Sequence, residues 1–297
     1  MNLFEIFTRF PTHETCIAYL EKVRWGDEPH CPNCGSLHVA CKSDGARIGR
    51  WNCHGCKSSF NVLQGTIFQK TKIPLQKWFM AISLILNAKK GVSSFQLARD
   101  LDMNQKSAWF MAMRIRRAMQ DHHTKLLTGI VEMDETYIGG KPRKGKHYDD
   151  PDDKPKRGRG TKKTPVVGAI ERKGAVSAQT VNKGKMKRED MQAYVQQFVD
   201  TTRTHLVTDE YSGYQDMRHV LPHSVVRHSQ WYVDGDIHTN TIESFWAILK
   251  RGIFGQFHSV SPKHLQRYVD EFCYRYNLCK HNRQDIFELT IARGLGI

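Results

Sequence analysis

The sequence predicts an α/β protein in which a small zinc-binding module and a helical module precede a larger domain of strands and helices. Two matched cysteine pairs stand near the amino terminus, the next segment has helical periodicity and basic side chains, and later strands end in acidic residues. A chain of 297 residues, at roughly 100–200 residues per domain, is expected to form two or three domains. We place them at 1–70, 71–128 and 129–297.

The composition favours a folded protein without a membrane span. Apolar residues make up 39% of the chain, which is enough to build hydrophobic cores. No run approaches the ~18 apolar residues of a spanning helix, and the first residues lack the basic-then-apolar pattern of a signal peptide. We therefore expect a cytoplasmic protein.

The charge balance favours a polyanionic partner. The chain has 45 Lys+Arg against 30 Asp+Glu, a net charge of +15, and such a balance is typical of proteins that bind nucleic acid. The excess is concentrated, because residues 71–128 hold ten basic and three acidic residues whereas residues 233–297 hold eight and seven. A basic protein without a nucleic-acid partner is the alternative.

The cysteines of the first module have the spacing of a zinc site. Cys31-x2-Cys34 and Cys53-x2-Cys56 are separated by eighteen residues, which matches the C-x2-C-x15–20-C-x2-C zinc pattern. Four thiolates close a tetrahedral site and leave no open coordination position, so the expected Zn2+ is structural. Such a ribbon binds DNA, RNA or protein.

The second module is predicted to be a helix-turn-helix. Apolar residues recur at helical spacing from Leu75 to Leu86, and Ser93 with Gln96 forms a capping-box pair before a second helix. A third helix follows with an apolar face and several basic side chains. We expect this helix to lie in the major groove of DNA, with a plain three-helix bundle as the alternative. Its candidate DNA contacts are Lys106, Arg114, Arg116 and Arg117.

Residues 139–164 break every hydrophobic period. They hold ten Lys+Arg, four Asp, five Gly and three Pro, and this composition cannot bury a core. We predict a mobile basic loop. The composition slightly favours an arm that orders on DNA backbone over a passive linker.

The third module has strands and helices in the order of a ribonuclease-H-like fold. Strands are predicted at 129–134, 165–170, 175–181 and 205–209, with helices at 188–202 and 240–251. In that fold the first strand, the fourth strand and a late helix each bring a carboxylate to one place. Here these are Asp134, Asp209 and Glu243, whereas Glu132, Glu135 and Glu210 are interpreted as neighbours without a role.

Three carboxylates in one place suit metal-dependent cleavage of a phosphodiester. Two divalent ions can activate a nucleophile and stabilise the leaving oxygen, and Mg2+ or Mn2+ prefers oxygen ligands. On the last predicted helix, Asn240, Glu243, Ala247 and Lys250 share one face, while Phe245, Trp246 and Leu249 point into the core. Lys250, followed by Arg251, is placed to hold DNA phosphate near the metals.

The chain resembles bacterial insertion-sequence transposases that carry a zinc ribbon before a DDE domain, the ISXO-like group. The resemblance extends from about Pro29 to Asn277. The motifs that carry it are CPNC…CHGC, GTIFQKTKIPLQKWFMAI, MDETYIGGK, the basic loop, TDEYSGY, HTNTIESFWAILKRG and HLQRYVDEFCYRYN.

This resemblance implies metal-dependent strand cleavage and transfer between inverted repeats and target DNA, in the bacterial cytosol and associated with the nucleoid. It implies Asp134 and Asp209 as the first two catalytic acids. Members of the group have either Asn or Glu as the third residue, followed by Lys, and this chain offers both Asn240 and Glu243 before Lys250. A carboxylate binds Mg2+ better than an amide, which favours Glu243 and leaves Asn240 as an auxiliary ligand or a positioning residue.

The expected reaction has two steps without a covalent protein–DNA link. Water cleaves the phosphodiester at the element end, and the freed 3′-OH attacks target DNA. Two ends must be held at once, so we expect at least a homodimer on double-stranded DNA. A DNA-binding regulator without catalysis and a simple metal-dependent nuclease are the alternatives. The sequence leaves open the repeat sequence, the target preference and whether this copy is active.

Overall fold

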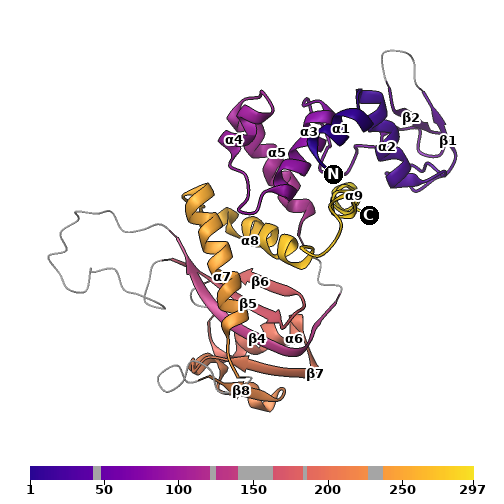
Figure 1. The fold of residues 1–297 in the computed structure, drawn as a ribbon. Coiled ribbons are helices and arrows are strands. Elements are labelled where there is room, and N and C mark those ends of the chain that lie inside the picture. Colours follow the sequence, from indigo (N-terminus) through magenta and orange to yellow (C-terminus); the bar gives the residue numbers. More distant parts are fainter. Residues whose placement is uncertain (43–47, 121–124, 140–162, 183–185, 227–236) are drawn as a thin grey trace. The chain divides into compact units, whose positions relative to one another are not determined.

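The chain forms two compact units in the computed structural model (Figure 1), which describes residues 1–42, 48–120, 125–139, 163–182, 186–226 and 237–297. The first unit comprises Met1–Gln120 together with Lys280–Ile297, and the second comprises Asp121–Cys279. In the described parts of the chain, no helix is long and apolar enough to cross a membrane. Most of the basic segment 139–164 lies outside the described residues.

The first unit begins with two capped helices and a small antiparallel sheet. Asn2 and Thr12 cap the first turns of the helices through their side chains, and the strands pair in the order β1-β2-β3. Every strand is short, because the sheet mainly presents the two cysteine pairs. The elements are α1 (Leu3–Arg9), α2 (His13–Trp25), β1 (Val39–Cys41), β2 (Arg50–Cys53) and β3 (Ser59–Asn61).

Three helices follow at the positions that the periodicity predicts. Ser93 accepts the backbone N–H of Gln96, and Asn104 accepts that of Ser107, so the second and third helices each begin at a capped residue. The apolar residues of the first helix are buried as its spacing requires. The helices are α3 (Leu75–Asn87), α4 (Ser94–Asp100) and α5 (Gln105–Ala118).

The carboxyl-terminal helix α9 (Arg283–Leu295) belongs to this first unit and not to the domain predicted at 129–297. Its Phe287 is 1% exposed and meets the ring of Phe79 in α3 with centroids 5.9 Å apart. The backbone N–H of Ile67 donates to the carbonyl of Gly294. The last residues of the chain therefore complete the core of the first unit. The cysteine-bearing sheet and helices α3 to α5, predicted as two domains, belong to this one unit.

The second unit is a five-stranded mixed sheet with the order β6-β5-β4-β7-β8. The first three strands in sequence are antiparallel to one another, whereas β4 pairs with β7, and β7 with β8, in parallel. This mixed α/β organisation agrees with the predicted fold class. The strands are β4 (Leu127–Ile138), β5 (Thr164–Glu171), β6 (Val176–Thr180), β7 (Val199–Thr208) and β8 (His223–Val225).

The largest differences from the predicted boundaries lie at the end of β4 and at the junction of α6 (Arg188–Phe198) with β7. The strand predicted to end at Asp134 continues to Ile138, because Thr136, Tyr137 and Ile138 keep pairing with β5, so Asp134 lies within the strand. The helix α6 ends four residues before the predicted position, and β7 starts at Val199. The segment Val199–Thr204 holds a Val and three Thr, and β-branched residues favour strands over helices.

The two faces of the sheet are covered by different helices. Met133 and Val131 of β4 face a core that includes Val195 and Phe198 of α6. Because side chains alternate along a strand, Glu132 and Asp134 face the opposite side, where α7 (Asn240–Gly252) contacts β4 and β5 (Figure 1). The central strand therefore supplies one apolar face and one face with two carboxylates.

The helix α8 (Pro262–Asn277) pairs with the edge strand β6 through side chains. Asn277 accepts the backbone N–H of Val176 at 2.8 Å and donates to its carbonyl at 3.0 Å, and Gln266 accepts the N–H of Thr180. These amides satisfy backbone groups that an edge strand otherwise leaves unpaired. A π-helical turn, Ile253–Phe257, and Gly252 connect α7 to α8, and Gly252 packs on Phe272.

Candidate functional site

The four cysteines of the first unit converge on one point. The Sγ atoms of Cys31 and Cys56 lie 3.7 Å apart, those of Cys34 and Cys53 lie 3.6 Å apart, and all four lie within 4.8 Å of one another. Four thiolates placed tetrahedrally about 2.3 Å from one ion are separated by about 3.8 Å. The spacing of the sulfur atoms therefore fits a single tetrahedral zinc ion.

The chemistry of this cluster favours a thiolate-binding metal. A hydrogen bond with the Ser58 side chain, followed by one with the Ser58 backbone, lowers the pKa of Cys56 to about 6. A backbone hydrogen bond from Ser36 lowers the pKa of Cys34, but hydrogen bonds with Cys53 and Cys56 outweigh it and raise that pKa to about 11, which a bound cation would reverse. Thiolates are the metal-binding form of cysteine. The knuckles also need close backbone approach, since a Cβ on Gly55 would lie 3.2 Å from the side chain of Ser36.

Asp134 lies at the centre of the second candidate site, on the central strand β4. Burial first, then the negative charges of Glu135 and Asp209, raises its pKa to about 7. The indole Nε1–H of Trp246 donates to Asp134 Oδ2 at 3.1 Å and favours the ionised form. Asp134 is thus a carboxylate that is costly to ionise and is held by one donor from α7.

A glycine opposite Asp134 makes room for that donor. Gly168 of β5 is the cross-strand partner of Asp134, and a Cβ on Gly168 would lie 2.5 Å from Cη2 of Trp246. The indole ring therefore occupies the space where a side chain of β5 would otherwise stand. Periodicity placed Trp246 in the core, where it is buried, but did not reveal its hydrogen bond to Asp134.

Asp209, predicted as the last residue of its strand, directly follows β7, which ends at Thr208. Its Oδ1 accepts the backbone N–H of Tyr211 at 3.0 Å, an Asx-turn that fixes the side chain just beyond the strand. Because β7 is the parallel neighbour of β4, the end of β7 lies beside Asp134. The effect of Asp209 on the pKa of Asp134 shows that the two charges interact.

The predicted residues of α7 divide between an exposed and a buried face, as the spacing requires. Asn240, Glu243 and Ala247 are exposed and Lys250 is half-buried, whereas Phe245 and Leu249 are buried. Burial lowers the pKa of Lys250, and Asp134 and Glu243 act in the opposite direction. The Lys250 ammonium is therefore in electrostatic reach of two of the three predicted acids.

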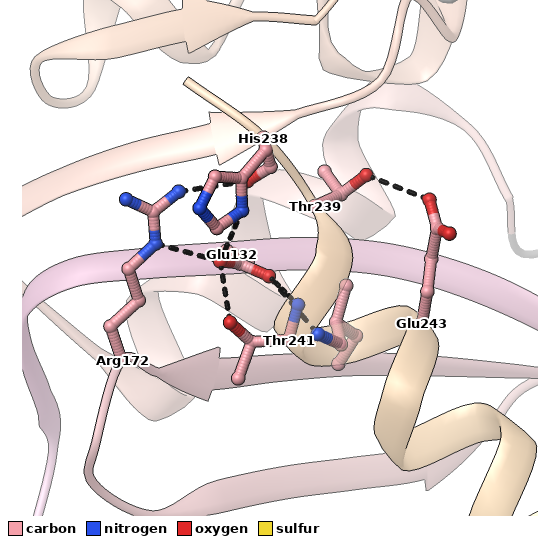
Figure 2. A network of polar contacts seen from close by, with 7 residues as sticks. Glu132, Arg172, His238, Thr239, Thr241 and Glu243 are labelled. Atoms are coloured by element: carbon pink, nitrogen blue, oxygen red, sulfur yellow. Dashed lines mark hydrogen bonds and ion pairs between the residues drawn. The ribbon is translucent and has the colours of Figure 1, made fainter. Parts of the chain in front are cut away.

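The three acids do not share one ligand shell in this structure. Among the described residues, the four cysteines form the one group of three or more Cys, His, Asp or Glu whose ligand atoms lie within 4.8 Å of one another. Each acid instead accepts a hydrogen bond of its own, and Glu243 Oε1 accepts that of Thr239 Oγ1 at 3.0 Å (Figure 2). Like charges repel, and these separate donors hold the carboxylates apart.

The structure also shows two partners of the acidic site that the sequence analysis missed. Tyr214 is fully buried and donates to Glu135 Oε2 at 2.9 Å, and burial, followed by Glu135, Asp134 and Asp209, raises its pKa well above the usual value. Glu132, interpreted as a neighbour without a role, is fully buried and contacts the first turn of α7 (Figure 2).

Two of the predicted DNA contacts on α5, Arg116 and Arg114, make contacts within the protein. Arg116 is 2% exposed and donates to the sulfur of Met113, so its guanidinium is covered by the protein and is not on the surface of α5. Arg114 donates to the carbonyls of Ile67 and Gln69 at 2.8 Å each and ties this preceding segment to α5. Lys106 and Arg117 are exposed, as is Arg251 at the end of α7.

The chain thus combines two units. One holds a four-cysteine cluster suited to a metal ion, and the other holds a mixed sheet that carries acidic residues. A family model described as an ISXO2-like transposase domain matches residues 126–277, and one described as a transposase zinc-ribbon domain matches residues 11–59. The chain belongs to the ISXO2-like transposase family. The predicted family resemblance is thereby confirmed, and the chain is an insertion-sequence transposase.

A relative extends over nearly the whole chain. An uncharacterized protein in transposable element ISH50 of Halobacterium salinarum is 27% identical over 299 residues, which cover 96% of this chain and 98% of that protein. Among solved structures, the Mos1 strand transfer complex matches with a TM-score of 0.30 and 14% identity over 73% of this chain and 78% of that one. A pre-cleavage Mos1 transpososome matches with a TM-score of 0.28 and 15% identity, covering 72% and 77%.

Replacing Cys31 or Cys53 by Ser should release zinc and unfold the ribbon. A structural zinc ion contributes about 10–16 kcal/mol of binding free energy to folding, so loss of one thiolate should be severe. Metal content and amide exchange of residues 11–59 measure the effect. Cys41→Ser is the matched control, because Cys41 is exposed and outside the cluster. Full zinc occupancy in Cys31→Ser would contradict the assignment.

Asp134→Asn should stabilise the protein without added divalent ions, and more so as the pH rises. Folding raises the pKa of Asp134 from 3.8 to about 7. Below about pH 4 the carboxyl is protonated in both states, and between about pH 4 and 7 only the unfolded chain releases the proton, so folding becomes less favourable until the penalty levels off.

Thermal unfolding of both proteins at about pH 5 and about pH 8 measures this gain. Glu210→Gln is the control, because Glu210 is an exposed carboxylate two residues from the end of β7. If Asp134→Asn raised the thermal stability by the same amount at both pH values, ionisation of Asp134 would not destabilise the folded protein.

Proposed function

We propose that this transposase cleaves DNA at the ends of an insertion sequence and joins them to target DNA, with Asp134, Asp209 and Glu243 holding divalent cations. The observation that carries the proposal is the partly buried carboxylate of Asp134 on the central strand of a transposase domain. Its charge interacts with Asp209 and with Lys250 of α7. A carboxyl group whose pKa is strongly raised by burial and by neighbouring charges is typical of a functional site.

A ribonuclease-H-like sheet is the fold that we propose for the second unit. The order of three antiparallel strands, a helix, and a parallel strand beside the first supports it. So does the placement of the acids on the central strand, after the neighbouring parallel strand and on a later helix.

The donor set suits hard divalent cations. Carboxylate oxygens are the ligands that Mg2+ and Mn2+ prefer. Burial, followed by the negative charges of Glu135 and Asp209, raises the pKa of Asp134, and a bound cation would lower the cost of ionising it. Divalent ions in such a site supply an activated water and stabilise a leaving oxygen. Asn240 lies one turn before Glu243 on the exposed face of α7, where its amide can serve as an auxiliary ligand or orient a ligand.

The residues of the chain orient the DNA and the acids. Trp246 directs one oxygen of Asp134 through its N–H. Lys250, half-buried and near Asp134 and Glu243, binds a phosphate of the scissile strand, and Arg251 extends this contact along the exposed end of α7. The first step adds water to phosphorus and breaks the P–O3′ bond, which leaves a 3′-OH and a 5′-phosphate. The 3′-OH then attacks a target phosphodiester and releases a new 3′-OH.

The first unit is proposed to recognise the element ends. The zinc ion of the ribbon is structural, because four thiolates fill its coordination sphere. Helices α3, α4 and α5 act as a helix-turn-helix in which α5 carries the exposed Lys106 and Arg117 toward DNA phosphate. Two ends are brought together by at least a homodimer on DNA.

Neutralising both exposed basic residues of α5 should weaken end binding and flatten its salt dependence. Each lost phosphate contact lowers the log–log salt slope by about 0.9, so Lys106→Gln with Arg117→Gln should lower it by about two. Binding of a duplex with the terminal repeat is measured over a salt series. Lys89→Gln with Lys90→Gln removes the same charge from exposed positions at the end of α3. If the slope of the α5 variant equals that of wild type, this helix does not contact the backbone.

Asp134→Asn and Asp209→Asn should each abolish cleavage while end binding persists. Asn is nearly isosteric but lacks the charge that holds a cation, and cation stabilisation worth several kcal/mol corresponds to about a thousandfold or more in rate. Glu243→Gln should be as severe, Asn240→Ala milder, and Lys250→Ala should weaken positioning of the end without removing metal binding. Cleavage of a labelled element end in Mg2+ or Mn2+ scores all five variants.

The pattern of the five variants decides between alternatives. Normal cleavage by Glu243→Gln together with an inactive Asn240→Ala would make Asn240 the third ligand. Cleavage by both Asp variants would overturn the triad, whereas end binding without any cleavage by the wild-type protein would favour a DNA-binding regulator. Cleavage without joining to a target duplex would favour a simple nuclease.

A further inference from the structure

Glu132 lies two residues before Asp134, on the same face of β4, and is fully buried. Four hydrogen-bond donors and the imidazole of His238 surround its carboxylate (Figure 2). Oε1 lies 2.7 Å from Arg172 Nε, 2.8 Å from Thr241 Oγ1 and 3.3 Å from His238 Nδ1, and Oε2 accepts the N–H groups of Thr241 and Ile242 at 2.8 and 3.0 Å. With these positions filled, Glu132 is distinct from the acids that we propose as cation ligands.

The two backbone contacts replace a cap that α7 lacks. The N-cap residue Thr239 makes no side-chain capping bond, and its hydroxyl donates to Glu243 instead. The first N–H groups of a helix have no partner within the helix. Glu132 accepts two of them, and its charge is favourable at the positive end of the helix dipole. The strand that carries Asp134 thus caps the helix that carries Glu243.

Arg172 and His238 add a contact to the segment that precedes α7. Arg172 follows β5 and donates both to Glu132 and, at 2.9 Å, to the carbonyl of His238. The His238 carbonyl is one residue before the N-cap Thr239. Arg172 therefore holds the entry to α7 and the carboxylate that caps it at the same time.

The contacts between β4 and α7 repeat at matching intervals. On the strand, Glu132 and Asp134 are about 6.8 Å apart along the axis. On the helix, Thr241 and Ile242 contact Glu132, and Trp246, four to five residues later, contacts Asp134, an interval of about 6–7.5 Å. Sliding or turning the helix would break one of the two contacts, so together they fix its register on the strand.

We propose that Glu132 is a positioning residue for the acidic site, an inference that rests on the proposed function. It acts through α7, holding the helix so that Glu243 and Lys250 stand at a set position relative to Asp134. Glu132 itself touches neither DNA nor cation. A residue with this role affects the affinity of the site for cations, whereas one that only stabilises the fold does not.

The test uses Glu132→Gln in the full chain, since Gln keeps the volume but loses the charge and one acceptor. The Mn2+ concentration for half-maximal cleavage of a duplex with the element's terminal repeat should rise about tenfold to a hundredfold, as for other residues that orient metal ligands. Without added divalent ions, the amides of Thr241 and Ile242 should exchange faster with solvent.

Glu271→Gln is the matched control, because Glu271 is equally buried and bonded to an arginine, Arg275, at 2.7 Å. Its Mn2+ dependence and the exchange at Thr241 and Ile242 should stay at wild-type values. Thr241→Val is a milder variant that removes one hydroxyl donor to Glu132 and should shift the Mn2+ dependence in the same direction by about two- to tenfold. If Glu132→Gln does not fold, the Mn2+ dependence of Thr241→Val tests the proposal in its place.

Wild-type Mn2+ dependence and wild-type exchange in the folded variants would overturn the proposal. So would a loss of thermal stability in Glu132→Gln, like that in Glu271→Gln, without a change in Mn2+ dependence. These outcomes differ from a failure of the proposed function itself. That failure appears as absent cleavage by the wild-type protein in Mn2+, or as normal cleavage by Asp134→Asn.

Discussion

The buried charge on the central strand is the constraint around which the second unit is built. Asp134 stands between two paired strands, and burial beside Glu135 and Asp209 makes its ionised form costly. The surrounding residues compensate in part: Trp246 donates to it, Gly168 leaves space for the indole, and Lys250 places a positive charge nearby. The positions of Trp246, Gly168 and Lys250 are thus all related to the carboxylate of Asp134.

The chemistry-bearing residues of this chain were largely predictable because they follow short-range rules. The cysteine spacing predicts a tetrahedral cluster, and the sulfur atoms converge as expected. Glu243 lies on the predicted helix, Asp134 lies inside its strand instead of at the end, and Asp209 directly follows its strand. Their catalytic role stays a prediction. The fold class, mixed α/β, followed from the order of strand and helix patterns.

The misplaced residues show where such rules are insufficient. Arg116 was counted as a surface charge, although it lies four and eight residues after the buried Ala112 and Ala108, a spacing that predicts the same inward face. The sequence also contained a signal for Glu132. Because side chains alternate along a strand, Glu132 and Asp134 fall on the same face of the predicted strand. The partners of Glu132 come from 40 and more than 100 residues away, and no local pattern reveals them. The same holds for α9, whose membership in the first unit depends on contacts with α3.

The pairing of α8 with the edge of the sheet also limits how copies of this chain can assemble. Asn277 and Gln266 occupy backbone groups of β6 that a strand from another molecule would need. The opposite edge strand, β8, is three residues long in the described chain, which offers few hydrogen bonds for pairing. A continuous sheet across two protomers is therefore disfavoured on both sides. In the homodimer that we propose on DNA, the copies would meet through helices, loops or the nucleic acid, and those contacts could form and separate without opening the sheet that holds the acids.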